Sequence, residues 1–187
     1  MRIAIPLLLL TGGCLEQTAL QCPANTSLVG SYSLVRSANK DGGDACTYTD
    51  DAGAHSLAVD NPQNQQASLC FANTSDAGPQ LQLLVAGKGG LRTSDLLPDG
   101  GFHFASDPVV AQGTACTCDV SVVETFDGFL TTSPPFGLLP DGGLPPVSGL
   151  TGTQSDRITA PAAGCGGLAQ RCNVPCSLSY AVSSSAF

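Results

Sequence analysis

Few side chains in this sequence could carry acid–base or nucleophilic chemistry. The chain holds two histidines, His55 and His103, and two glutamates, of which Glu16 lies close to the N-terminus and Glu124 in the main part of the chain. A Gly-x-Ser-x-Gly nucleophile motif, a His-Glu-x-x-His zinc motif and a phosphate-binding loop with its lysine are all missing. We therefore predict no catalytic residue and no cofactor.

Glu124 is the one acid whose position suggests chemistry. In a strand predicted over residues 114–126, it shares a face with Cys116 and Cys118, so the carboxylate should point inward. An inward carboxylate could act as a general acid or anchor a ligand, with a raised pKa. We prefer two plainer interpretations: the strand leaves the sheet at Glu124, or Arg157 pairs with it.

An acidic stretch around Cys46 could offer oxygens to a calcium ion. Its members are Asp41, Asp44, Asp50 and Asp51. Their spacing does not match a calcium-binding loop, and a solvated acidic loop is the preferred interpretation. His55 lies nearby and is interpreted as a surface histidine, so we predict no metal site here.

The cysteines indicate an oxidising compartment. There are nine: Cys14, Cys22, Cys46, Cys70, Cys116, Cys118, Cys165, Cys172 and Cys176. If Cys14 is set aside, the other eight can close four disulfides, as expected of an exported domain. A zinc site built on Cys116-x-Cys118 is the alternative, but zinc sites usually show Cys-x-x-Cys pairs or histidines at matching spacing.

The spacing of the cysteines limits their pairing. Residues two apart in a strand lie on one face with parallel side chains, so Cys116 and Cys118 should bond to different partners and not to each other. We expect those partners among the closely spaced group Cys165, Cys172 and Cys176. For the rest we predict a Cys46–Cys70 bridge, which leaves Cys22 for the remaining one.

The N-terminus carries the strongest pattern in the chain. Arg2 precedes an apolar run over residues 3–10, and small residues lead directly to Cys14. The run is too short to span a bilayer as a helix but has the order of a secretory signal. It resembles the lipobox of bacterial lipoproteins, with Thr11 where an aliphatic residue is commoner. The resemblance implies a diacylglycerol on Cys14; the alternative is an ordinary cleaved signal.

The expected organisation follows from that cysteine. Residues 1–13 form the signal peptide, residues 14–21 a lipid-anchored tether and residues 22–187 one disulfide-bonded domain. Residues 15–21 reach at most about 25 Å when extended, which holds the domain close to its membrane. Leu15 follows Cys14 where Asp would retain the protein in the inner membrane. By resemblance to Gram-negative lipoproteins, this implies an outer-membrane location, at the periplasmic face or the cell surface.

Composition excludes one large class of function. The chain of 187 residues has 7 basic and 15 acidic residues, a net charge of −8, and no basic cluster. Binding to a phosphate backbone needs a positive face, so we predict no nucleic-acid partner. The only predicted partners are the membrane, through the lipid on Cys14, and an unidentified envelope protein or small apolar ligand.

Alternation of apolar and polar residues predicts an all-β domain. The flanking rings of Phe102 and Phe104 should point inward, with His103 outward. About eight strands separated by turns predict one antiparallel sandwich or barrel, stapled by disulfides. The clearer strands are predicted at residues 27–36, 81–85, 102–104, 114–126 and 177–183, and the weaker ones at 55–59, 66–72 and 148–158.

Turn signals divide these strands. The sequence Leu-Leu-Pro-Asp-Gly-Gly occurs at residues 96–101 and again at 138–143, and each copy predicts a tight turn. Residues 131–148 hold five prolines and are predicted to form a long exposed loop.

The first predicted strand opens with Val29-Gly30-Ser31-Tyr32. This resembles the Gly-x-aromatic opening of lipocalin-type barrels, with Tyr in place of Trp. The resemblance implies a barrel. Three functions stay open: a non-catalytic structural or interaction module of the envelope, which we favour; a lipocalin-like carrier of a small apolar ligand; and a small hydrolase.

Overall fold

The structure is a computed structural model that describes residues 20–39, 46–50, 52–56, 63–74, 78–88, 90–111, 119–160 and 173–187. Within these ranges it consists of strands joined by turns and loops. The strands of the main sheet are β1 (Ser27–Ala38), β4 (Gln63–Thr74), β5 (Gly78–Val85), β6 (Arg92–Asp95), β7 (Gly101–Ala105), β8 (Val109–Ala111), β9 (Val120–Thr132), β10 (Val147–Thr159) and β11 (Cys176–Ala186). A separate hairpin pairs β2 (Thr47–Asp50) with β3 (Gly53–Ser56). The described part of the chain contains no helix long and apolar enough to cross a membrane.

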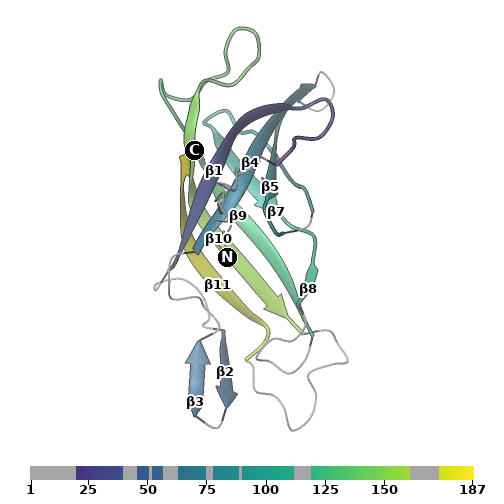
Figure 1. The fold of residues 1–187 in the computed structure, drawn as a ribbon, viewed down its shortest axis with the longest axis vertical. Helices are drawn as coiled ribbons and strands as arrows, with labels where there is room; N and C mark the ends of the chain where they lie inside the picture. Colours follow the sequence, from purple (N-terminus) through teal and green to yellow (C-terminus); the bar gives the residue numbers. More distant parts are fainter. Residues whose placement is uncertain are drawn as a thin grey trace, which may run out of the picture.

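The nine strands of the main sheet form one antiparallel meander that nearly closes into a barrel (Figure 1). The strand order is β6-β5-β4-β1-β11-β10-β9-β7, and β8 also pairs with β9, so β7 and β8 together act as one broken strand. The first and last strands, β1 and β11, pair with each other. At the seam between β6 and β7, the main-chain N–H of His103 donates to Ser94 Oγ at 2.8 Å. The prediction of an antiparallel β-domain is confirmed, and its form is barrel-like.

Most predicted strands are present, with shifted ends. The strand predicted over 114–126 is β9, which runs from Val120 on to Thr132; residues 114–118 lie outside the described ranges. The strand predicted over 55–59 is the short β3, with residues 57–59 outside those ranges. β2, β6 and β8 were not predicted, because each is short and lacks a run of alternating apolar residues.

Alternation along the strands fills the barrel with two apolar clusters. The larger cluster includes Phe102 and Phe104 of β7, which are buried, whereas His103 between them is exposed, as predicted. The rings of Phe102, Phe104 and Phe126 pack together, with their centres 4.9–6.4 Å apart. The smaller cluster lies around Cys46, Cys176 and Ile158. Between the two clusters, inward positions of β1, β9 and β10 hold the charged residues Arg36, Glu124 and Asp156.

Tyr32 lies in the larger cluster and is fully buried. Its hydroxyl donates to the carbonyl of Val147 at 3.1 Å, which ties β1 to the start of β10. A Cβ at Gly30 would lie 2.7 Å from the Tyr32 hydroxyl, so only glycine leaves room for the ring there. The Gly-x-aromatic sequence therefore has a packing reason: the aromatic side chain folds back over the glycine.

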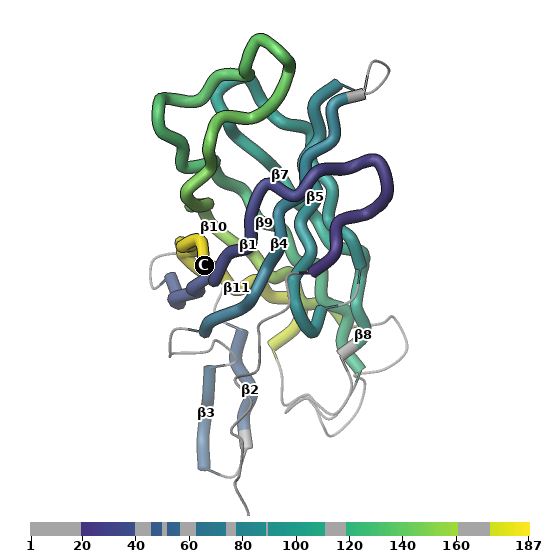
Figure 2. Tube along the Cα trace, turned by 45° about the horizontal axis from the view of Figure 1, so that its top comes forward, coloured from purple at the N-terminus to yellow at the C-terminus, as the bar shows by residue number. Residues whose placement is uncertain are grey.

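The two Leu-Leu-Pro-Asp-Gly-Gly segments form the same tight turn, as predicted. In each turn the N–H of the last glycine bonds to the aspartate Oδ1, at 3.0 Å in the first and 2.9 Å in the second. Gly100 and Gly142 have φ of 84° and 79°, in the region that favours glycine. The second turn belongs to the connection between β9 and β10, at the opposite end of the barrel from the β2–β3 hairpin (Figure 2).

Two disulfides lie in the described part of the chain, and they correct the predicted pairing. Cys22 bonds to Cys70, which fixes the N-terminal segment to β4, and Cys46 bonds to Cys176, which fixes the β2–β3 hairpin to β11. The predicted Cys46–Cys70 bridge is wrong. Cys70 lies outside the smaller apolar cluster, whereas Cys46 and Cys176 both lie within it. Cys176 is therefore not a partner for Cys116 or Cys118.

Four cysteines of the predicted framework lie outside the described residues, as does the lipidation site Cys14. They are Cys116, Cys118, Cys165 and Cys172. The exclusion of a Cys116–Cys118 bond stays a prediction.

Candidate functional site

A pocket of about 320 Å³ lies inside the barrel, towards the β2–β3 end. We call it the barrel pocket. Its lining residues come from β1, β9, β10, the β5–β6 connection, β6 and the broken β7–β8 strand. They are Arg36, Gly87, Lys88, Arg92, Ser106, Val109, Val122, Glu124 and Asp156.

Strand alternation places charged side chains in this pocket. On β1, Arg36 occupies the inward position between Leu34 of the larger cluster and Ala38 beside the smaller one. On β9, Glu124 lies in the same way between Phe126 and Val122. The charges are therefore held in a layer between two apolar clusters, where water screens them poorly.

Glu124 points into the barrel, as its face of the strand predicts, and is paired at both oxygens. Lys88 Nζ bonds to Oε2, and Arg92 Nη2 lies 3.1 Å from Oε1. Neither predicted alternative holds. The strand does not end at Glu124, because β9 continues to Thr132. Arg157 does not pair with Glu124, because its side chain lies on the outer face of β10. The two cations that pair with Glu124 come from β6 and from the connection before it, which closure of the barrel brings beside β9.

Asp156 lies directly opposite Glu124 in the β9–β10 pairing. Burial is the main cause that raises the pKa of Asp156, and the neighbouring Glu124 charge raises it further. A hydrogen bond from Gln154 Nε2 at 2.8 Å and the charges of Lys88 and Arg36 act in the other direction. Two like charges facing each other across a ladder need cations beside them, and this layer supplies them.

Arg36 is held from three sides. Its Nη2 donates to Gln63 Oε1 at 2.6 Å, its Nη1 lies 3.7 Å from Asp156 Oδ2, and its guanidinium carbon lies 5.0 Å from the centre of the Tyr180 ring. These contacts fix the guanidinium against the wall formed by β1, β4 and β11.

Both arginines of the pocket nevertheless have N–H groups that form no hydrogen bond with the described residues. Within the described residues, Arg92 Nε and Nη1 and Arg36 Nε are buried and donate to no partner. The Arg92 side chain is only 4% exposed. Three cations, Arg36, Lys88 and Arg92, face the two carboxylates of Glu124 and Asp156. The described side chains of this layer therefore carry a formal charge of plus one when both acids are ionised.

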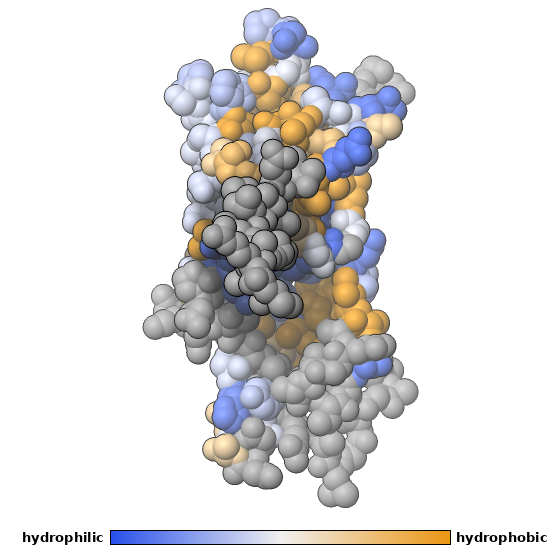
Figure 3. All heavy atoms as spheres, viewed as in Figure 1, coloured by the Kyte–Doolittle hydropathy of each residue, from blue (hydrophilic) through white to orange (hydrophobic). Residues whose placement is uncertain are grey.

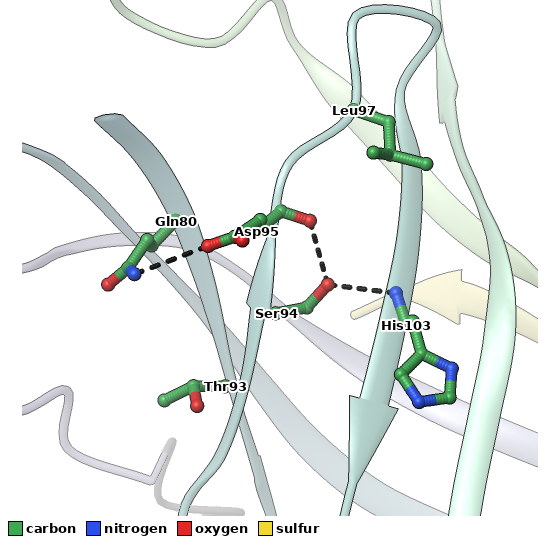
Figure 4. Close-up of a pocket in the computed structure, with 6 residues that line it drawn as sticks. All are labelled: Gln80, Thr93, Ser94, Asp95, Leu97 and His103. Atoms are coloured by element: carbon green, nitrogen blue, oxygen red, sulfur yellow. Dashed lines mark hydrogen bonds between the residues drawn. The ribbon is translucent and has the colours of Figure 1, made fainter. Parts of the chain in front are cut away.

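A second pocket, of about 430 Å³, lies at the β6–β7 seam and is lined in part by His103 (Figure 4). Ser94 Oγ donates to the Asp95 carbonyl at 2.8 Å and accepts from the His103 main-chain N–H. The imidazole turns away and lies with Nδ1 2.5 Å from Asp127 Oδ1, where both side chains are more than half exposed. The serine hydroxyl and the imidazole therefore do not form a nucleophile–base pair.

The acidic stretch around Cys46 is only partly described. Asp41, Asp44 and Asp51 lie outside the described ranges, and His55 stacks on Tyr48 with ring centres 4.9 Å apart. Among the residues that the structure describes, no group of three or more histidine, cysteine, aspartate or glutamate side chains could hold a metal ion.

Sequence reasoning identified Glu124 but missed the cations around it. Arg36 follows Tyr32 and Leu34 on the inward face of one predicted strand, which is a signal that could have revealed it. Arg92 and Lys88 had no comparable signal, since β6 was not predicted.

Comparison with known protein families, with curated proteins and with solved structures finds no match for this chain.

Proposed function

We propose that this chain is an exported, lipid-anchored protein of the bacterial cell envelope that acts as a non-catalytic interaction module. The lipobox-like sequence before Cys14 supports the lipid anchor, and the outer membrane is its proposed location. The disulfides Cys22–Cys70 and Cys46–Cys176 fit an oxidising compartment outside the cytoplasm. Cys22 follows the short tether directly, so the barrel would sit close to the membrane.

The pairing of Glu124 carries the non-catalytic part of the proposal. A general acid needs a proton on one carboxyl oxygen and a free path from that oxygen to a substrate. Both oxygens of Glu124 are instead paired with cations: Lys88 Nζ bonds to Oε2, and Arg92 Nη2 lies 3.1 Å from Oε1. The carboxylate is therefore arranged as the counter-ion of two basic side chains, and what the pocket still offers is N–H donors for binding.

A lipocalin-like carrier is the second candidate, favoured by the barrel itself and by an internal pocket. The pocket is not a dry apolar cavity, because five of its lining side chains carry charges. A purely apolar ligand would leave these charges desolvated and unpaired, at a high cost in free energy. A carrier of this architecture would need a ligand with a charged or strongly polar group.

The hydrolase alternative has less support. His103 and Asp127 form a pair on the outer face of the barrel, and the nearest pocket serine, Ser94, is engaged with the main chain. A solvent-exposed ion pair of this kind is a common surface feature and contributes little to stability.

Two measurements test the proposal. Mass spectrometry of the N-terminal peptide of the mature protein should find fatty acyl groups on Cys14, and a Cys14→Ser variant should leave the membrane fraction. Purified protein should show no turnover of esterase, glycosidase or peptidase substrates. A Cys14→Ser protein that still fractionates with membranes contradicts the lipid anchor, and activity that disappears in Glu124→Gln or His103→Ala with folding intact contradicts the non-catalytic role.

A further inference from the structure

The barrel pocket holds more positive than negative charge, in a place where charge is costly to bury. Among the described residues that line it, with Glu124 and Asp156 both ionised, one of the three cations has no carboxylate of its own. Buried charges in proteins are paired, because an isolated one loses its hydration without compensation. A ligand carrying a single negative charge would balance the layer.

The unpaired N–H groups lie in the same place as the unbalanced charge. Arg92 Nε and Nη1 and Arg36 Nε are buried without a partner in the described part of the chain. The Arg92 side chain is more than nine-tenths buried and lines the pocket. Hydrogen bonds from a guanidinium to an anionic oxygen are among the strongest in proteins, so these donors would favour an oxyanion over a neutral group.

The rest of the pocket wall is apolar on one side. Val109 and Val122 line it together with Gly87. Val109 and the adjacent Val110 are more than half exposed, and Figure 3 shows apolar surface at the position of β8. The side chain of Lys88 is also partly exposed, at 28%. Because Val109 and Lys88 both line the pocket and reach the surface, we place its mouth between β8 and the β5–β6 connection.

We propose that the barrel pocket binds a small organic monocarboxylate, whose carboxylate accepts hydrogen bonds from Arg92 and Arg36 and whose short apolar part lies along Val109 and Val122. This inference rests on the proposed role as a binding module and names its ligand class. The volume of about 320 Å³ is at the small end of the range for ligand pockets, which suits a short chain or a single ring. A single carboxylate suits the single unbalanced charge better than a doubly charged phosphate.

Isothermal titration calorimetry of the full chain in a non-ionic detergent tests this with matched probes. Hexanoate provides the carboxylate and the apolar chain, hexan-1-ol provides the same chain without charge, and inorganic phosphate provides charge without the chain. Hexanoate should bind at least about tenfold more tightly than either of the others, because a charge-assisted bond to a buried guanidinium is lost with hexan-1-ol.

Three variants locate the site. Arg92→Met should weaken hexanoate binding by about tenfold to a hundredfold. Since that change also removes a partner of Glu124, the double variant Arg92→Met/Glu124→Gln removes both members of this pair and leaves only Lys88, whose side chain is 28% exposed, without its carboxylate. The double variant should show the same loss of hexanoate binding, with its fold checked by circular dichroism. Arg157→Met, on the outer face of β10 next to Asp156 in sequence, is the control and should bind as the wild type does.

The outcomes separate this inference from the proposed function. Equal binding of hexanoate and hexan-1-ol, or phosphate binding as tight as hexanoate binding, would overturn the carboxylate assignment. So would full hexanoate affinity in the double variant, or no binding of any probe by the folded wild type. In each case the lipid anchor and the absence of turnover are measured independently, so the proposed function stands or fails on its own results.

Discussion

Arg92 on β6 and Glu124 on β9 form an ion pair inside the barrel, with Arg92 Nη2 3.1 Å from Glu124 Oε1. The two side chains are 4% and 12% exposed, so water screens the pair poorly. The glutamate holds the arginine in position, and the arginine keeps its other N–H groups for a further partner. This relationship links the fold of the barrel to its proposed use.

Glu124→Gln should destabilise the protein strongly. It leaves Arg92 and Lys88 buried or half-buried without their counter-ion, and breaking such a pair from one side typically costs about 3–5 kcal/mol. The free energy of unfolding from urea titration measures this. Asp127→Asn, which breaks the exposed pair with His103, is the matched control and should cost no more than about 1 kcal/mol. Equal, small losses in both variants would show that the Glu124 pair is not buried.

Asp156 should make stability depend on pH in a defined direction. Burial first, then the facing Glu124, raises its pKa above the ordinary value of 3.8, against Gln154, Lys88 and Arg36. The folded state therefore holds this proton more tightly than the unfolded state. Its contribution to stability is present below pH 3.8 and is lost as pH rises through the raised pKa.

The difference in unfolding free energy between wild type and Asp156→Asn isolates this contribution. The wild type should lose stability relative to Asp156→Asn as pH rises from about 3.8. Asp107→Asn, at an exposed position between β7 and β8, is measured beside it as the control. A difference that shifts in favour of the wild type with rising pH would mean that the cations outweigh burial at Asp156.

The hydroxyl of Tyr32 should ionise at a higher pH than that of an ordinary tyrosine. Burial raises the pKa of its hydroxyl to about 12, so near-ultraviolet absorbance should show one tyrosine that ionises near that pH. The stability that the protonated hydroxyl contributes is complete below pH 10 and is lost as pH rises towards 12.

Tyr32→Phe provides the corresponding variant. It should abolish the late absorbance step and cost about 1 kcal/mol at neutral pH, because the carbonyl of Val147 loses its donor. If the late step persists in Tyr32→Phe, the buried tyrosine is a different one.

Non-reducing peptide mapping should recover the bonds Cys22–Cys70 and Cys46–Cys176. The second bond closes the longer loop, with a sequence separation of 130 against 48 for the first. Replacing either pair by alanine should cost about 2–4 kcal/mol, since each bond restricts the unfolded chain. Recovery of a Cys46–Cys70 peptide would contradict this pairing, and a Cys116–Cys118 peptide would contradict the predicted exclusion.

The sequence predicts the strands with clear alternation, the inward Phe102 and Phe104, and the two repeated turns, because these depend on local spacing alone. It also predicts that Glu124 points inward. It does not predict which cations reach Glu124, since that depends on how the barrel closes and on β6. The inward positions of β6 are Arg92 and Ser94, so the strand lacks the apolar pattern that identifies strands in sequence.

The disulfides are unpredictable for a different reason. Eight cysteines can pair in about a hundred ways, and spacing excludes few of them. The choice of Cys176 over Cys70 for Cys46 depends on the path of the chain around the end of the barrel, which joins residues far apart in sequence.

The Nε–H resonance of Arg92 tests most directly whether the buried guanidinium of this residue belongs to a binding site. In a ¹⁵N-labelled protein, the Nε–H signal of Arg92 is the one that disappears in Arg92→Met. Addition of hexanoate should shift this signal, and hexan-1-ol should leave it in place. An Arg92 signal that does not move, while the amides of Thr93, Asp95 and His103 at the β6–β7 seam shift with hexanoate, would contradict the claim.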